Sequence, residues 1–114
     1  MIQIPSEVLK RLNEHELKFY IRLASLGLRP VIEFKFHPVR KWRFDLALVE
    51  NQIAVEIEGG TWVAGRHSRG AGYRKDLEKY NSALVWGWRV LRYTPDMIEQ
   101  MQQDVVNLIQ GGRV

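Results

Sequence analysis

The chain has 114 residues, about the size of one domain, and 46% of them are hydrophobic and 26% charged, which excludes a disordered or collagen-like chain. The 17 Lys and Arg residues outnumber the 13 Asp and Glu residues, so the net charge of +4 and the pI near 9.6 suit a polyanionic partner. The absence of cysteine excludes disulfides, thiolate zinc sites and thiol nucleophiles.

The first ten residues, MIQIPSEVLK, contain no apolar run of signal-peptide length. No window approaches the roughly 20 apolar residues that a bilayer-spanning helix needs. We therefore expect a cytoplasmic protein without membrane-spanning segments. Because we find no internal repeat, linker or low-complexity stretch, residues 1–114 should form a single domain.

The first expected element is helical. Residues 6–26 repeat apolar side chains at helical spacing, which predicts one amphipathic helix or two helices with a break near Asn13. Ser6 is the expected N-cap, and Gly27 is expected just beyond the helix end.

Three strands should follow as an antiparallel meander. Residues 31–37 alternate apolar and polar side chains, as do residues 43–48 and 53–58. The alternation predicts that Phe44, Leu46, Leu48, Ile53, Val55 and Ile57 face the core. It places Asp45, Glu56 and Glu58 on the opposite face, with residues 50–52 as the turn between their strands.

The second half of the chain should add a helix, a strand and a last helix. A glycine-rich loop leads into a helix whose buried stripe is Tyr73, Leu77, Tyr80 and Leu84 and which ends near Gly87. Residues 88–93 predict a strand. The last helix begins with Thr94 as N-cap and Pro95 at its first position. At least one of Trp86 and Trp88 should pack in the core.

Three acids sit where the strands should be paired. If the second and third strands pair through their short turn, Asp45, Glu56 and Glu58 approach one point. Clustered carboxylates repel one another, and a divalent cation compensates them. Oxygen ligands favour Mg²⁺, with Mn²⁺ as an alternative. The competing interpretation is an ordinary solvated sheet face.

Two features favour a site over a solvated face. Gly59 and Gly60 follow the acids directly, where the backbone of a ligand can come close. Cations suited to phosphates come next in the chain: Arg66, Arg69, Arg74, Lys75 and Lys79, together with His67.

These residues resemble a known family. An Asp followed by Glu-x-Glu on the adjacent strand, in the order α-β-β-β-α-β-α, looks like the PD-(D/E)xK nuclease superfamily. The fuller string RFDLAL…IAVEIEGGTW…GRHSRGAGYRKDLEKYN…GWRVLRYT is more specific. It resembles small phage and bacterial endonuclease-like domains related to very-short-patch-repair endonucleases, over about Glu16 to Thr94. The resemblance implies an α+β, restriction-endonuclease-like fold with a mixed sheet flanked by helices.

The resemblance also implies residue roles. Asp45 and Glu56 would hold Mg²⁺, and Glu58 and Glu16 would complete or support its shell; the alternative for Glu16 is a helix-surface salt bridge. Glu58 stands where the superfamily more usually has a Lys that orients or activates the attacking water. We expect Lys79 or Lys75 to supply the missing cation, or else a second metal or His67 to help; the alternative for Lys79 is a solvated helix face.

The implied activity is a metal-dependent DNA endonuclease that leaves 5′-phosphate and 3′-hydroxyl ends, acting in DNA repair or recombination. The cations expected to hold DNA are Arg40, Lys41, Arg43, Arg66, Arg69, Arg74 and Lys75, and Trp62 is the candidate wedge or stacking platform. A chain this small grips little duplex, so a homodimer is attractive. The alternatives are a Holliday-junction resolvase with the same chemistry and a DNA-binding module that has lost catalysis.

Overall fold

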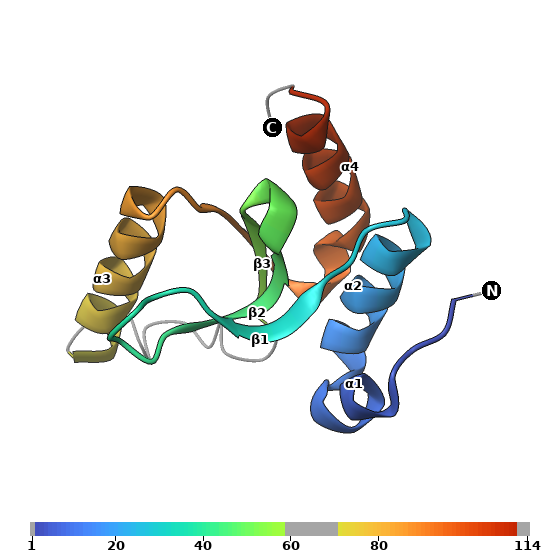
Figure 1. Ribbon diagram of the computed structural model, residues 1–114, viewed down its shortest axis with the longest axis horizontal. Coiled ribbons are helices and arrows are strands. Elements are labelled where there is room, and N and C mark those ends of the chain that lie inside the picture. The colour runs from blue at the N-terminus through green and yellow to red at the C-terminus, as the bar shows by residue number, and fades with distance from the viewer. Residues whose placement is uncertain (1, 59–70, 112–114) are drawn as a thin grey trace.

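The computed structural model describes residues 2–58 and 71–111 (Figure 1). The predictions for six residues concern positions outside these ranges: Gly59, Gly60, Trp62, Arg66, His67 and Arg69. Among the described helices, none is both long and apolar enough to cross a membrane.

The N-terminal segment forms two helices. α1 (Ser6–Arg11) ends before Leu12, and α2 (Glu14–Ser25) begins after Asn13. The Glu16 N–H donates to Asn13 Oδ1 at 2.8 Å, and the Asn13 N–H donates to Glu16 Oε1 at 3.0 Å, so the two residues form a capping box. Of the two alternatives for this segment, two helices with a break near Asn13 are confirmed, because this box begins a new helix.

The start of α1 differs from the sequence prediction, whereas the end of α2 agrees with it. Pro5, not Ser6, is the N-cap of α1, and no side chain caps that helix. Gly27 has φ +83° beyond the end of α2, and the Leu28 N–H donates to Leu23 O at 3.3 Å. This is the glycine-terminated end that the sequence predicts.

In the described part of the chain, four strands form one mixed sheet in the order β1-β2-β3-β4. β1 (Val31–Lys35), β2 (Arg43–Leu48) and β3 (Ile53–Ile57) form the predicted antiparallel meander. β4 (Arg89–Tyr93) runs parallel to β3, because α3 (Ala71–Val85) carries the chain across the sheet between them.

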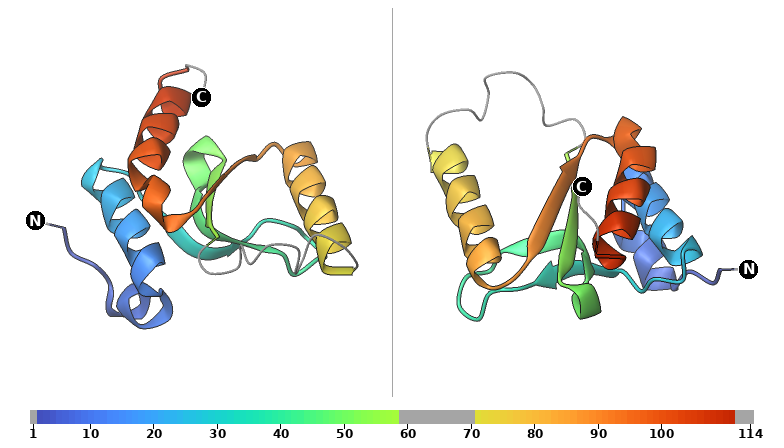
Figure 2. Two further views of the ribbon diagram at one scale, coloured as in Figure 1. Left: turned by 180° about the vertical axis from the view of Figure 1, so that it is seen from behind. Right: turned by 90° about the horizontal axis from the view of Figure 1, so that it is seen from above.

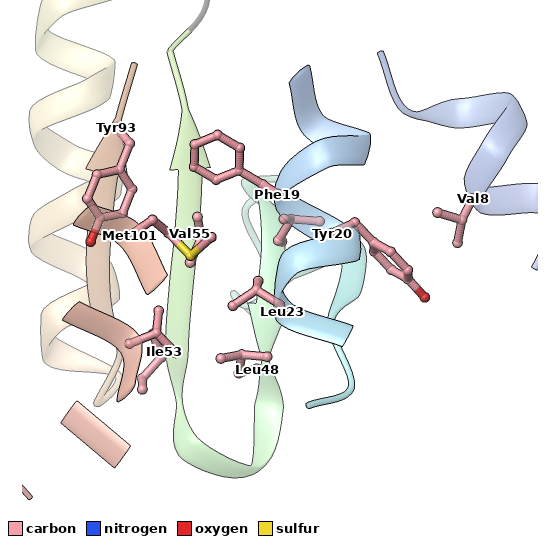
Figure 3. Packing of buried hydrophobic residues seen from close by; sticks show 11 residues of the cluster. Val8, Phe19, Tyr20, Leu23, Leu48, Ile53, Val55, Tyr93 and Met101 are labelled. Carbon is pink, nitrogen blue, oxygen red and sulfur yellow. The ribbon is translucent and has the colours of Figure 1, made fainter. Parts of the chain in front are cut away.

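Helices cover both faces of this sheet. α2 and α4 (Ile98–Ile109) lie on one face and α3 lies on the other (Figures 1 and 2). The larger core fills the space between the sheet, α2 and α4 (Figure 3). Its buried residues are Val8, Phe19, Tyr20, Leu23, Leu46, Leu48, Ile53, Val55, Tyr93, Met101 and Val105.

The β1–β2 hairpin changes faces halfway along. Ile32 and Leu46 pack with the larger core, whereas Phe34 and Phe44 pack in a second cluster on the α3 side. Between Ile32 and Phe34, Glu33 has φ +49°, a left-handed conformation that is uncommon for a residue with a side chain, while the pairing register stays constant. The prediction that Phe44 shares a face with Leu46 is therefore wrong, because side chains alternate only in a regular strand.

The stripe predicted to be buried on α3 is mostly exposed. Tyr73, Leu77 and Leu84 are 46%, 48% and 70% exposed, whereas Ala83 is fully buried. The spacing correctly indicates which residues share a face of the helix. It does not indicate which face meets the sheet, and the small Ala83 allows α3 to approach the sheet on a different side. Tyr80 is half-buried and belongs to the site described below.

The end of α3 agrees with the sequence prediction, but the start of the last helix does not. α3 ends at Val85, and Gly87 has φ +90°, as expected for a helix that ends there. A 3₁₀ turn, η2 (Pro95–Met97), follows Thr94 and precedes α4, so the last regular helix begins later than predicted. Trp88 is 6% exposed, which confirms that at least one of these two tryptophans packs in the core.

Candidate active site

Asp45 and Glu56 join β2 to β3 at the point where the regular ladder ends. The last paired residues are Leu46 and Val55. Beyond them, the Asp45 N–H donates to Glu56 Oε2 at 2.7 Å, and the Ile57 N–H donates to Asp45 Oδ2 at 2.9 Å. Each carboxylate thus accepts a backbone N–H of the neighbouring strand, which fixes the two acids next to each other.

Two consecutive residues of α3 hold Glu56. Lys79 Nζ lies 2.7 Å from Glu56 Oε1, and the Tyr80 hydroxyl donates to the same oxygen at 2.9 Å. The side chains of Glu56 and Lys79 are 7% and 16% exposed, so the pair is nearly buried. A carboxylate at that depth needs a charged partner and hydrogen bonds, and α3 supplies both. The competing interpretation, an ordinary solvated sheet face, does not hold for Glu56, because α3 covers it.

Asp45 carries less compensation than Glu56. Burial, together with the negative charges of Glu56 and Glu16, raises its pKa from 3.8 to about 6, although the Ile57 N–H and Lys79 oppose the shift. The carboxyl group therefore takes up a proton more readily than an ordinary Asp. A cation placed beside it would favour the ionised form.

Tyr80 remains a hydrogen-bond donor at neutral pH. Burial and the adjacent Glu56 carboxylate both raise the pKa of its hydroxyl, so the phenol stays protonated. The guanidinium carbon of Arg92 lies 4.4 Å from the centroid of the Tyr80 ring, in a cation–π contact. Tyr80 is therefore held on both its hydroxyl and its ring face.

Glu58 turns away from the other two acids. It hydrogen-bonds to Arg92 of β4, and this contact is the first cause of the raised pKa of Arg92. The Glu58 N–H donates to Tyr93 O at 2.7 Å, so beyond β3 the chain follows β4. The prediction that Asp45, Glu56 and Glu58 meet at one point is therefore wrong. Within residues 2–58 and 71–111, no three acidic or histidine side chains gather at a spacing suited to a metal ion.

Glu16 has a local role and a longer-range effect. Its carboxylate caps the start of α2 through Asn13, and Lys18 pairs with Glu14 instead, at 3.6 Å. Glu16 is still near enough to raise the pKa of Asp45. Glu16 therefore affects Asp45 electrostatically, while its carboxylate is bonded to the backbone of Asn13.

The described cations of the predicted DNA surface fall into two groups. On the β1–β2 hairpin, Arg40 pairs with Glu78 of α3 at 3.1 Å, Arg43 pairs with Glu33 at 3.2 Å, and Lys41 is exposed. The second group, Arg74 and Lys75, is exposed in the first turns of α3, before Lys79. In the sequence, the first group precedes Asp45 and the second group follows Glu56.

Two residues of this site do not stand out in the sequence. Helical periodicity predicts a core position for Tyr80, next to Lys79. Arg92 belongs to no motif, yet it stands directly opposite Glu56 in the β3–β4 register. Parallel pairing of β4 with β3 is the signal that would have placed Arg92 among the acids.

One solved structure resembles this chain throughout most of its length. The homing endonuclease I-Bth0305I catalytic domain matches over 87% of this chain and 92% of its own, with a TM-score of 0.56 and 21% sequence identity. At that identity the likeness shows that the two chains share a fold. No family model and no curated protein matches the sequence.

Proposed function

We propose that this protein is a metal-dependent DNA endonuclease that hydrolyses phosphodiester bonds to 5′-phosphate and 3′-hydroxyl ends. The observation that carries the proposal is the Asp45–Glu56 pair, joined across two strands and contacted by Lys79, within the fold of an endonuclease domain. The proposal includes membership of the PD-(D/E)xK superfamily, near the very-short-patch-repair endonucleases.

The donor set fits a magnesium ion. Mg²⁺ is usually held by one or two carboxylates, with water and substrate phosphate as the other ligands. Asp45 and Glu56 are the residues that would hold it, with Glu16 in support, and Mn²⁺ has the same preference for oxygen. Glu58 is less suited, because Arg92 already neutralises it. When bound, the ion would supply charge stabilisation at the phosphate and a more acidic water.

Lys79 could supply the cation that is missing at the position of Glu58. The superfamily more usually has a Lys at the position of Glu58, and here a Lys from the following helix contacts Glu56 instead. We infer that Lys79 is the relocated cation. From this position its ammonium group can orient water or stabilise charge beside the two acids, while the Tyr80 hydroxyl keeps Glu56 in a single orientation.

DNA would approach the side of the molecule that carries the hairpin and the start of α3. Lys41, Arg74 and Lys75 are exposed there, and Arg40 and Arg43 could exchange their carboxylate partners for phosphates. One domain of this kind provides one Asp45–Glu56 pair, so we propose that two copies act together when both strands of a duplex are cut.

A cleavage panel tests the proposal. Single-stranded, duplex, mismatched and four-way-junction DNA would be incubated with the wild-type protein in EDTA, Mg²⁺ or Mn²⁺. Asp45→Asn and Glu56→Gln keep the shapes of the two side chains and should abolish cleavage, and Glu50→Gln, an exposed acid on the β2–β3 turn, should not. Metal-dependent cleavage that survives both site substitutions would show that the site is wrong.

The same panel separates the alternatives. Preferred cutting of the four-way junction would favour a resolvase. Binding of DNA without cleavage of any substrate, in either metal, would favour a module that has lost catalysis.

A further inference from the structure

Trp86 is half exposed at the C-terminal end of α3. It follows the last residue of α3 and is 50% exposed, whereas Trp88, two residues later, is 6% exposed and packs in the second cluster. Its backbone oxygen accepts a hydrogen bond from Gln52 Nε2 at 3.4 Å, a contact that any residue could make. The Trp86 ring therefore offers an aromatic surface to solvent.

The β1–β2 hairpin braces this ring. The His37 ring stands edge-on to Trp86, with centroids 5.9 Å apart and an interplanar angle of 70°. His37 is itself fixed, because its Nδ1 accepts the N–H groups of Val39 and Arg40 at 3.1 and 2.8 Å. Trp42 contacts the same imidazole at 5.3 Å. An exposed ring held in this way loses little freedom when a flat group stacks on it.

The surroundings of Trp86 favour an anionic ligand. The guanidinium group of Arg40 lies 4.2 Å from the centroid of the Trp42 ring, and Lys41 beside it is exposed. The hairpin carries the cations Lys35, Arg40, Lys41 and Arg43. Its acid Glu33 is paired with Arg43, and Glu78 of α3 is paired with Arg40. A ligand with both a flat ring and a negative charge suits this combination.

The distance along α3 connects Trp86 to the acidic pair. Trp86 comes seven residues after Lys79, which corresponds to about 10 Å at the rise of an α-helix. One or two nucleotides of an extended strand cover a span of that order. A strand whose phosphate lies at Asp45 and Glu56 could therefore place a nearby base on Trp86.

We propose that Trp86, braced by His37, is a stacking platform for an unpaired nucleobase, with Arg40 and Lys41 holding the adjacent phosphate. The proposal rests on the proposed function in taking DNA as the ligand, and it goes beyond it in assigning a preference for single-stranded or frayed DNA. Stacking on an aromatic ring requires a base that is free of its partner strand, so intact duplex gains little from Trp86.

Binding in EDTA tests this platform without any cleavage. A labelled twelve-nucleotide poly-dT strand and a blunt duplex of the same length would be titrated with wild type, Trp86→Ala, Trp86→Phe and the control Val85→Ala, whose side chain is exposed next to Trp86. We expect Trp86→Ala to weaken single-strand binding about tenfold and duplex binding less than twofold. Val85→Ala should change neither.

Trp86→Phe keeps an aromatic face and provides a second measurement. It should bind the single strand within about threefold of wild type and should lose much of the tryptophan fluorescence quenching that the single strand produces. The platform would be overturned if a folded Trp86→Ala protein bound both ligands equally weakly relative to wild type, or bound both as tightly as wild type. Undiminished fluorescence quenching in Trp86→Phe would also overturn it.

The two proposals can fail separately. If the wild-type protein cuts DNA but these binding results are negative, only the platform is wrong. If Trp86 supports single-strand binding but no substrate is ever cut, the platform stands and the assignment of catalysis fails.

Discussion

Lys79 Nζ lies 2.7 Å from Glu56 Oε1, and both side chains are nearly buried between α3 and the sheet. The Lys79 cation is thus the main electrostatic partner of a carboxylate that the fold has removed from water. This one contact therefore affects both the stability of the fold and the proposed chemistry.

Removing the Lys79 charge should destabilise the fold. In Lys79→Met, Glu56 stays buried with only its hydrogen bonds, and we expect a loss of about 2 kcal/mol, below the range for fully buried pairs because the site is partly open. Urea unfolding at pH 8 measures it. The double variant Lys79→Met, Glu56→Gln should recover part of the loss, and a purely additive cycle would show that the two side chains are not coupled.

Asp45→Asn should increase stability at neutral pH without metal. The pKa of Asp45 is raised from 3.8 to about 6, so the folded state binds this proton more tightly than the unfolded state does. Its favourable contribution is full below about pH 4 and is lost as the pH rises to about 6, worth roughly 2 kcal/mol after allowance for solvent.

The test compares urea unfolding of wild type and Asp45→Asn in EDTA at several pH values. The advantage of the variant should grow between about pH 4 and pH 6 and then stay constant. A difference that does not change with pH would mean that the Asp45 pKa is ordinary.

Divalent metal should stabilise the wild-type protein through the two acids. A ligand that binds only the folded state adds about 1.4 kcal/mol at ten times its Kd. Thermal melts in EDTA and in increasing Mg²⁺ or Mn²⁺ should show a rising Tm for wild type and a constant Tm for the double variant Asp45→Asn, Glu56→Gln. Equal shifts in both proteins would place the metal elsewhere.

Tyr80→Phe should cost about 1–2 kcal/mol, because it removes a hydrogen bond to a buried charged oxygen. The exposed Tyr73 on the same helix provides the matched control, since Tyr73→Phe removes a hydroxyl from a residue that is 46% exposed. That control should change stability by less than about 0.5 kcal/mol. Similar losses in the two variants would remove Tyr80 from the Glu56 site.

The left-handed Glu33 predicts a reversed order of two substitutions. Glu33→Ala and Glu33→Gly both lose the ion pairs with Arg11 and Arg43, but only Gly adopts φ +49° without strain. Glu33→Gly should therefore be more stable than Glu33→Ala by about 1 kcal/mol. At Lys35, on the same strand with ordinary φ, Ala should be the better residue, and the same order at both positions would contradict this account.

The sequence allowed the helices, the meander and the neighbouring positions of Asp45 and Glu56 to be predicted, because periodicity and short turns act locally. Lys79 became a candidate only through the family resemblance. It misassigned what depends on the packing of distant segments. The side of α3 that meets the sheet depends on Ala83, a residue with little pattern of its own. The turn of Glu58 toward Arg92 depends on β4 pairing with β3, which residues 88–93 do not signal by themselves.

Phe44 illustrates a different limit. It packs in the second cluster while Leu46 packs in the larger core, and the change of face occurs where Glu33 of the paired strand has its unusual backbone angle, whereas alternation presumes a regular strand. Nothing in the sequence around Glu33 predicts its positive φ. The prediction of a strand was right there, and the prediction of its faces was not.

The exchange of backbone hydrogen bonds for carboxylate hydrogen bonds between β2 and β3 also affects the slow dynamics of the sheet. The amides of Asp45 and Ile57 are protected by side chains, so their hydrogen exchange should report local opening of the acidic pair instead of global unfolding. These two N–H groups therefore provide a probe of the candidate site that needs neither substrate nor metal.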